Sequence, residues 1–427
     1  FSTTQMMEQY RQQAKSPGKS IRHDGDAEAA LGSAAKKIEA VYEVPFLSHL
    51  MMEPLNCAVD LRANSCEIWT GTQFQTVDRM NAAKVAGLAP EQVQIHTTFL
   101  GGGFGRRANP QSDFVVEAVH VAKAAGSPVK VVWTREDDMH GGWYRPAYLH
   151  AIAGGVDASG NAVVWRSRLV GQSIMAGTPF EAMMTKGGYD PASVEGADDL
   201  PYEIPNLAVE YQKTEVNVPV QWWRSVGHSH TGFATECFID ELAGLAKKDA
   251  CEFRRALLRN HPRHLGVLEL AAQKAGWGTP LPKGRGRGIA VHSSFESYVA
   301  QVAEVSVEEG KVRVHRMVCA VDCGRYVNPN IVAAQMEGGA IMGASAALFQ
   351  ELTFENGRLL QTNFHTFPVV RMNETPEIET YLVESTEKSG GIGEPGVPCA
   401  APAICNAVFA ATGKRIRRLP IRMAEAV

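Results

Sequence analysis

The sequence predicts a mixed α+β fold, because strand-like and helix-like segments are interspersed along the whole chain. A strand-like run at 93–99 leads into a glycine-rich loop, and an apolar helical pattern follows at 112–125. Much later, two runs rich in valine, 299–307 and 312–321, flank Glu309-Gly310, a turn signal typical of a β-hairpin. Since strands and helices intermix, we expect an α+β or α/β protein rather than a β-sandwich.

The composition is that of an ordinary globular protein. With 427 residues, of which 45% are hydrophobic and 21% charged, the chain can bury a large core and divide into two or three lobes. The formal net charge is -4 and the basic residues are scattered, so we expect no nucleic-acid partner. The 8 cysteines include no C-x-x-C pair and no set spaced for an iron-sulfur cluster or structural zinc, so electron-carrying clusters would lie on another chain.

No run of about 18 uninterrupted apolar residues occurs, so we expect no membrane span. The closest segment, 338–349, is rich in glycine and alanine and predicts a tightly packed buried helix. The polar segment 1–36, with Asp24-Gly25-Asp26, predicts a linker or the tail of a preceding domain, so the chain is expected to be part of a longer product.

A first lobe is predicted over 37–273. Apolar alternation predicts short strands at 38–44, 57–61, 67–70 and 129–133, with the helix at 112–125 among them. A zone rich in Gly, Pro and Asp at 175–206 is typical of lids or subunit contacts.

Within this lobe, Trp222-Trp223-Arg224 precedes a helical pattern of apolar residues at 234, 238, 242 and 245. Arg224 therefore stands at the entrance of a helix. Two interpretations are open, an aromatic plug of the core with a surface arginine, or a clamp for a cofactor, and spacing alone favours the first.

A second lobe is predicted over 274–427. Its boundary is the segment 274–287, which combines prolines and four glycines. The hairpin at 299–321 opens the lobe, a helix is expected at 331–348, and a strand-like run at 378–383 and a helix-like run at 403–411 follow.

Glu394 lies in a loop, 389–396, that holds four glycines and Pro395. Glycines let the backbone approach a bulky ligand, and the proline biases Glu394 away from helical dihedral angles. The backbone therefore aims this carboxylate, although a plain solvated turn is the alternative interpretation.

A second glycine loop, 101–107, carries the sequence Gly-Gly-Gly-Phe-Gly-Arg-Arg between the strand at 93–99 and the helix at 112–125. Backbone N–H groups in such a loop favour phosphate or oxo groups, and Arg106 and Arg107 are expected to add positive charge. The loop has neither a dinucleotide-binding fingerprint nor a P-loop lysine, which disfavours the common nucleotide-binding folds.

Taken in order, these segments resemble the large, molybdenum-cofactor-binding subunit of the xanthine dehydrogenase and aldehyde oxidase family, most closely the isoquinoline 1-oxidoreductase β-subunit type. The segments that carry the resemblance are MEP at 52–54, WTGTQ at 69–73, GGGFGRR at 101–107, WRSVGHS at 223–229, ECFIDELA at 236–243, VDCGRYVNP at 321–329, GIGEPGVP at 391–398 and TGKRIRRLP at 412–420. The resemblance covers nearly the whole chain and implies a two-lobed molybdopterin-binding domain.

The resemblance implies a role for each candidate site residue. Glu394 matches the family's general base, which deprotonates the oxygen that attacks an electron-poor carbon. The implied cofactor-binding residues are Gln73, Gly103, Phe104, Gly105, Arg224, Gln335 and Gly393. No protein ligand to the metal is expected, since the dithiolene of the pterin holds molybdenum.

The implied activity is that of a molybdenum hydroxylase acting on an N-heteroaromatic compound or an aldehyde. The implied cofactor is molybdenum-molybdopterin in its cytosine dinucleotide form, with 2Fe-2S clusters on a small partner subunit. A membrane-associated aldehyde dehydrogenase that passes electrons to a cytochrome c subunit is the alternative within this class, and a structural subunit without catalysis is the alternative outside it. A periplasmic or peripherally membrane-associated location is consistent with the resemblance, while the sequence itself does not give the compartment.

The chain also departs from the family pattern. The family's Gly-Gln-Gly cofactor loop is absent, so the chain resembles the C-terminal portion of a longer subunit whose other half-domain lies N-terminal. Purine oxidases have a glutamate where this chain has Ala108 and an aromatic clamp where it has Val226. Both differences argue against a purine substrate.

Overall fold

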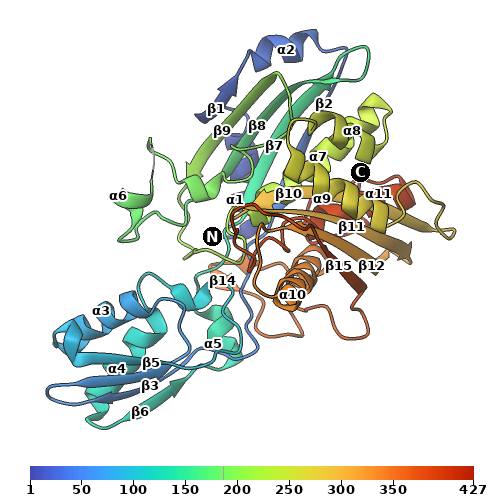
Figure 1. The fold of residues 1–427 in the computed structure, drawn as a ribbon. Helices are drawn as coiled ribbons and strands as arrows, with labels where there is room; N and C mark the ends of the chain where they lie inside the picture. Colours follow the sequence, from blue (N-terminus) through green and yellow to red (C-terminus); the bar gives the residue numbers. More distant parts are fainter. Residues whose placement is uncertain (186) are drawn as a thin grey trace.

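The computed structural model describes residues 1–185 and 187–427, and three β-sheets organise them (Figure 1). The first sheet has five strands in the order β1-β9-β8-β7-β2, and only the β8–β9 pair is parallel. Its strands are β1 (Lys19–Asp24), β2 (Lys36–Val44), β7 (Tyr148–Val156), β8 (Ala162–Gln172) and β9 (Asn206–Thr214).

The second sheet has the order β10-β11-β12-β15, with the parallel β15 at one edge. Its strands are β10 (Arg285–Ser294), β11 (Ser297–Glu308), β12 (Lys311–Asp322) and β15 (Glu377–Leu382). The helices that pack around it are α7 (His228–Ala246), α9 (Pro262–Lys274), α10 (Pro329–Leu348) and α11 (Ala400–Thr412). The alanine-rich α11 lies so close to β10 that a Cβ on Gly288 would come within 2.1 Å of the Ala407 nitrogen.

A small lobe projects at the lower left of Figure 1. Its sheet has the order β5-β4-β3-β6, and α3 and α4 pack against it over a hydrophobic core of its own. Its elements are β3 (Asn56–Leu61), β4 (Cys66–Thr70), α3 (Gln75–Ala86), β5 (Val93–Thr97), α4 (Asp113–Ala125) and β6 (Val129–Val132).

Short elements complete the fold. They are α1 (Thr3–Gln13), α2 (Ala27–Ser33), α5 (Arg135–His140), α6 (Glu181–Met184), α8 (Ala250–Leu257), the two-stranded β13 (Phe354–Glu355) and β14 (Arg358–Leu359), and the 3-10 turns at Pro90–Gln92, Arg106–Ala108 and Pro191–Ser193. Within the loop-rich zone predicted at 175–206, the described residues form α6, one of these turns and the first residue of β9; residue 186 lies outside the described residues.

The segment 1–36, predicted as a linker or the tail of a preceding domain, contains elements that pack on the rest of the protein. In α1, Met6 and Tyr10 are buried in a hydrophobic cluster, and β1 pairs with β9 in the five-stranded sheet. Arg11 also donates hydrogen bonds to Glu43 at 2.6 and 2.9 Å. The segment looked like a linker because it is polar, yet apolar residues four positions apart suffice to attach a short helix to a core.

The predicted boundary at 273/274 falls at the end of α9, before its last residue. Apolar residues from both sides of it, such as Leu268 and Val302, belong to one hydrophobic core that also spans the first two sheets. The predicted lobes 37–273 and 274–427 therefore do not have separate cores. The small lobe, by contrast, has a core of its own.

Most elements predicted from periodicity are confirmed, including the β11–β12 hairpin, α4, α7, α10 and α11. Strands β7, β8 and β9 were not predicted. Their burial patterns are nearly continuous rather than alternating, since both faces of this part of the sheet are covered.

Helix α10 is, in the described part of the chain, the one helix long and apolar enough to cross a membrane by length and composition. Half of its most apolar window is buried inside the protein, and it packs on α11 and β15. A core helix meets the same criterion, so this feature is weak evidence for a membrane span.

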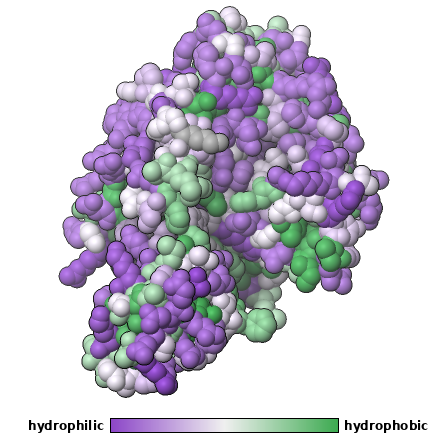
Figure 2. All heavy atoms as spheres, turned by 60° about the vertical axis from the view of Figure 1, so that its left-hand side comes forward, coloured by the Kyte–Doolittle hydropathy of each residue, from purple (hydrophilic) through white to green (hydrophobic). Residues whose placement is uncertain are grey.

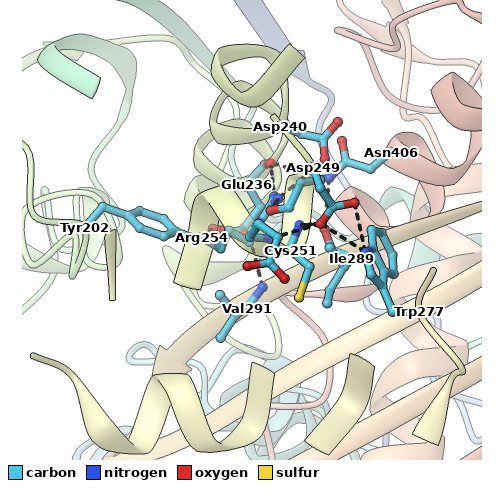
Figure 3. A network of polar contacts seen from close by, with 12 residues as sticks. Tyr202, Glu236, Asp240, Asp249, Cys251, Arg254, Trp277, Ile289, Val291 and Asn406 are labelled. Atoms are coloured by element: carbon cyan, nitrogen blue, oxygen red, sulfur yellow. Dashed lines mark hydrogen bonds and ion pairs between the residues drawn. The ribbon is translucent and has the colours of Figure 1, made fainter. Parts of the chain in front are cut away.

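A buried ion pair fixes α7 to its surroundings (Figure 3). Arg254 of α8 donates to a carboxylate oxygen of Glu236 at 2.9 Å, and both side chains are almost completely buried. Glu236 also accepts the backbone N–H of Val291 in β10 at 2.9 Å and the hydroxyl of Tyr202 at 2.5 Å. Burial disfavours the charged guanidinium, but the Glu236 carboxylate outweighs it and raises the pKa of Arg254.

We expect Arg254→Met to lower the free energy of unfolding by about 3–5 kcal/mol, because it leaves the buried Glu236 carboxylate without its counter-ion. Arg255→Met is the matched control. Arg255 pairs with Glu252 on the surface of the same helix, and exposed pairs contribute about 0–1 kcal/mol. Urea unfolding of both variants measures the difference, and equal losses would contradict the role given to the buried pair.

Candidate functional site

Three loops far apart in the sequence meet at one place, which we call the loop junction. They are the glycine loop (101–107), the arginine loop (221–227) and the glutamate loop (391–398), and Gln335 near the start of α10 joins them. All residues that the sequence singled out as candidates are part of these loops or bond to them. Their roles toward a ligand remain predictions.

In the glycine loop, Gly105 adopts φ +107°, which favours glycine. A Cβ there would lie 2.5 Å from the carbonyl oxygen of Trp222, whose indole N–H donates to the Gly105 carbonyl at 3.1 Å. The Gly105 N–H donates to Oε1 of Gln73 at 3.2 Å, and a Cβ on Gly103 would lie 2.4 Å from the same oxygen. Gly103 and Gly105 thus let the glycine loop lie close to the backbone and indole of Trp222 and to the side-chain amide of Gln73.

Arg224 connects the three loops. Its N–H donates to the carbonyl of Phe104 at 2.9 Å, and its Nε donates to the carbonyl of Gly393 at 2.7 Å. Its Nη2 donates to Oε1 of Gln335 at 2.8 Å. Burial lowers the pKa of Arg224 while the nearby Glu394 carboxylate opposes that shift. The sequence left two interpretations open for Arg224, a surface arginine beside an aromatic plug of the core or a clamp for a cofactor. Its position among the three loops favours the clamp, and its role toward a cofactor stays a prediction.

Glu394 is half-buried and held by Ser225. The Ser225 N–H donates to Oε1 of Glu394 at 2.9 Å, and the Ser225 hydroxyl donates to the Glu394 carbonyl at 2.7 Å. Ser225 and Val226 both adopt positive φ, +78° and +44°, a strained conformation for residues other than glycine. Such strain persists where the surroundings enforce it and is common at functional sites. Ser225 lies in the WRSVGHS segment that carries the resemblance, but no role was predicted for it.

Arg106 and Arg107 do not add charge for a ligand, so that expectation is wrong. Arg106 is buried and forms a two-point pair with Asp113 at 2.6 and 3.0 Å. Arg107 is fully buried and donates to Glu53 and to the carbonyls of Gly71 and Gly102. Both guanidinium groups serve to hold the glycine loop in place.

Glu195 is a second carboxylate at the junction, and the sequence did not indicate it because it lies in the loop-rich zone. Its Oε1 accepts the N–H of Gly227 at 2.7 Å, and 29% of its side chain is exposed. Burial raises the pKa of Glu195 to about 8, and the negative charges of Asp190 and Glu394 add to this effect.

Several hydrogen-bond donors at the junction have no acceptor within residues 1–185 and 187–427. They are the side-chain amides of Gln73 and Gln335, Nη1 of Arg224, and the backbone N–H groups of Gly102, Gly103 and Phe104. Gly393 also faces open space, since a Cβ there would meet nothing within 4 Å. This donor set suits a ligand with many acceptor atoms, such as oxo, carbonyl or phosphate groups.

The junction lies where the small lobe joins the rest of the protein. Gln73 and Gly393 are exposed, and Figure 2 shows the surface hollowed above the projecting lobe. Over the described residues, no group of three or more His, Cys, Asp or Glu side chains could hold a metal ion.

Comparison with known proteins gives two matching family models. Both are described as molybdopterin cofactor-binding domains, one over residues 11–258 and the other over 246–376. The regions matched by the two models overlap at 246–258, from the end of α7, whereas the sequence predicted a lobe boundary at 273/274.

Curated relatives point the same way. The chain is 33% identical over 395 residues to the beta subunit of isoquinoline 1-oxidoreductase from Brevundimonas diminuta, covering 91% of this chain and 49% of that protein. It is 32% identical over 440 residues to a membrane-bound aldehyde dehydrogenase of Gluconacetobacter polyoxogenes, covering 96% of this chain and 56% of that protein. The chain therefore spans about half the length of these relatives.

Solved structures share the fold. Quinoline 2-oxidoreductase from Pseudomonas putida 86 superposes with a TM-score of 0.83 at 14% identity, covering 96% of this chain and 79% of that one. Aldehyde oxidoreductase from Desulfovibrio gigas superposes with a TM-score of 0.75 at 16% identity, covering 95% of this chain and 62% of that one. The predicted mixed α and β architecture is thereby confirmed.

We expect Gly105→Ala to destabilise the protein more than Gly126→Ala. Both glycines have positive φ, so each alanine adds backbone strain of about 1–2 kcal/mol, but only the Cβ at 105 would collide with the carbonyl of Trp222. Thermal unfolding of the two variants measures the difference. Equal shifts in Tm would show that the close approach at the junction is not required for stability.

Proposed function

The chain belongs to the molybdopterin cofactor-binding domain family, and from this premise we propose that it provides the catalytic part of a molybdenum hydroxylase. Such an enzyme inserts an oxygen derived from water at an electron-poor carbon of an N-heteroaromatic compound or an aldehyde. The observation that carries the proposal is the loop junction, where Glu394 lies beside a set of donors suited to a molybdopterin.

In this proposal the cofactor-binding residues are Gln73, Gly103, Phe104, Gly105, Arg224, Gln335 and Gly393. The polar side chains among them, those of Gln73, Arg224 and Gln335, use some of their polar atoms to build the junction. Each keeps at least one nitrogen free to bind a ligand in a fixed orientation. The bound molybdenum centre would supply the two-electron oxidation.

Glu394 is the proposed general base. One of its carboxylate oxygens, Oε1, is oriented by the Ser225 N–H, while no residue that the structure describes donates to Oε2. A carboxylate held at one oxygen and free at the other can accept a proton at a defined position. The hydrogen bond from Arg224 to the carbonyl of Gly393 fixes the residue directly before Glu394.

The cytosine dinucleotide form of the cofactor and electron transfer to a small 2Fe-2S subunit are further parts of the proposal. The names of the relatives support two candidate substrate classes, N-heteroaromatic compounds and aldehydes. Isoquinoline 1-oxidoreductase and, at 29% identity over 94% of this chain, a nicotinate dehydrogenase subunit of Pseudomonas putida are named for N-heteroaromatic compounds. The membrane-bound aldehyde dehydrogenase supports the alternative, in which a cytochrome c subunit would accept the electrons.

We expect Glu394→Gln to keep the fold and the molybdenum content while kcat falls roughly 100- to 10,000-fold, the usual contribution of a general base. Glu387→Gln, at an exposed position seven residues earlier, is the control and should keep normal turnover. Steady-state kinetics and metal analysis of the full complex measure both effects. A Glu394→Gln enzyme with near-normal kcat would contradict the role of this residue, and a wild-type complex without molybdenum would favour a structural subunit.

We expect the assembled enzyme to oxidise a quinoline-type ring with a higher kcat/KM than a short aldehyde, because two of the three curated relatives named above, at 33% and 29% identity, are named for heteroaromatic compounds and one, at 32%, for an aldehyde. Substrate profiling with an artificial electron acceptor measures the preference. A reversed preference would favour the aldehyde dehydrogenase alternative.

A further inference from the structure

A row of buried titratable side chains leads away from the loop junction. Oε2 of Glu195 lies 3.9 Å from Nε2 of His228, so a small shift of the Glu195 side chain would bring the two atoms within hydrogen-bonding distance. The other ring nitrogen of His228, Nδ1, is hydrogen-bonded to Nε2 of His292 at 2.9 Å. Both histidines are buried, so this contact runs through the protein interior.

The first member of the row is attached to the same strained turn as Glu394. The Ser225 N–H binds Glu394, and the Gly227 N–H, two residues later, binds Glu195. Ser225 and Val226 both adopt left-handed backbone conformations in this turn. The arginine loop therefore positions two carboxylates that influence each other electrostatically.

The two histidines can relay a proton. Burial lowers the pKa of both His228 and His292, so both rings are neutral near pH 7. A neutral imidazole carries one N–H donor and one acceptor nitrogen, so a hydrogen-bonded pair passes a proton by changing tautomers. The ring of Phe295 covers His228 on another side, and Asp199 and Glu236 are the acidic groups that face His292.

Two residues that interact electrostatically with His292, Asp199 and His264, line a cavity of about 450 Å³. His264 interacts electrostatically with His292, and burial lowers the pKa of His264 to about 3. Asp199 both lines this cavity and interacts electrostatically with His292, so it connects the end of the row to the cavity.

We propose that Glu195, His228 and His292 form a proton path that connects the loop junction to this cavity and returns Glu394 to its ionised form after each turnover. This inference rests on the proposed function. In the reaction R–H + H₂O → R–OH + 2 H⁺ + 2 e⁻, the electrons leave to the iron-sulfur carrier, and both protons must leave the site separately. The path gives Glu394 an exit for its proton that does not depend on the opening occupied by the substrate.

The protonation of Glu195 fits this role. Below its pKa of about 8 the carboxyl is neutral, and since Oε1 accepts the Gly227 N–H, the proton resides on Oε2, the oxygen nearest His228. The acidic groups that surround it are Asp190, Asp198 and Glu394. A neutral carboxyl can hand one proton on and take up another, as a relay requires.

The test compares His228→Gln and Glu195→Gln with His150→Gln. His150 is the control because it also forms a buried histidine pair, with His230 of α7 at 3.0 Å, but lies outside the path. In the holoenzyme, stopped-flow kinetics with a pH-indicator dye follow proton release while the first turnover is recorded. We expect the path variants to release protons roughly tenfold or more slowly, with unchanged molybdenum content and KM and a larger solvent isotope effect on kcat. His150→Gln should behave like wild type.

A second measurement does not depend on turnover. Infrared titration of the wild type should show the carbonyl band of a protonated carboxyl that disappears as the pH rises through about 8, and Glu195→Gln should lack it. Absence of the band from the wild type, or equal proton release in His228→Gln and His150→Gln, would overturn the path. If the wild-type holoenzyme itself showed no turnover, that result would count against the proposed function. The infrared titration would still show whether Glu195 is protonated.

Discussion

The buried pair between Glu236 and Arg254 ties α7, the helix that follows the arginine loop, to α8 and to the second large sheet. A charge in the interior is tolerated only where a partner and hydrogen bonds replace water, and here the partners come from α7, α8, β10 and the segment around Tyr202. This requirement fixes α7 against α8 and against β10 of the second sheet. Because α7 begins at His228, directly after the arginine loop, the position of Arg224 follows from the packing of this helix.

Arg224 shows how a fold can prepare a binding site before the ligand arrives. Its backbone N–H and two of its guanidinium nitrogens bind protein groups, which immobilises the side chain and leaves Nη1 for a ligand. Gln73 and Gln335 follow the same principle, since each uses its amide oxygen within the protein. Fixed donors of this kind bind an acceptor-rich group without losing side-chain freedom on binding.

Local sequence patterns predicted the elements whose stability is local. The β11–β12 hairpin, α4 and α10 carry their own periodicity, turn residues or caps, so near neighbours in the chain contain the necessary information. The attachment of α1 and β1, and the inward direction of Arg106 and Arg107, depend on partners distant in the chain. Polar residues that are buried by such partners resemble surface residues when the sequence is considered alone.

The amino-acid sequence was sufficient to establish the backbone character of the loops and, through the order of its motifs, the family. Glycines and Pro395 restrict the main chain locally, whatever the surroundings. Folding was needed to show that Arg224 meets Gln335 and Gly393, 111 and 169 residues away, and that Glu195 lies near Glu394. The physical reason is that burial and hydrogen-bond pairing are properties of neighbours in space, which packing of the sheets and α7 brings together and which no local pattern records.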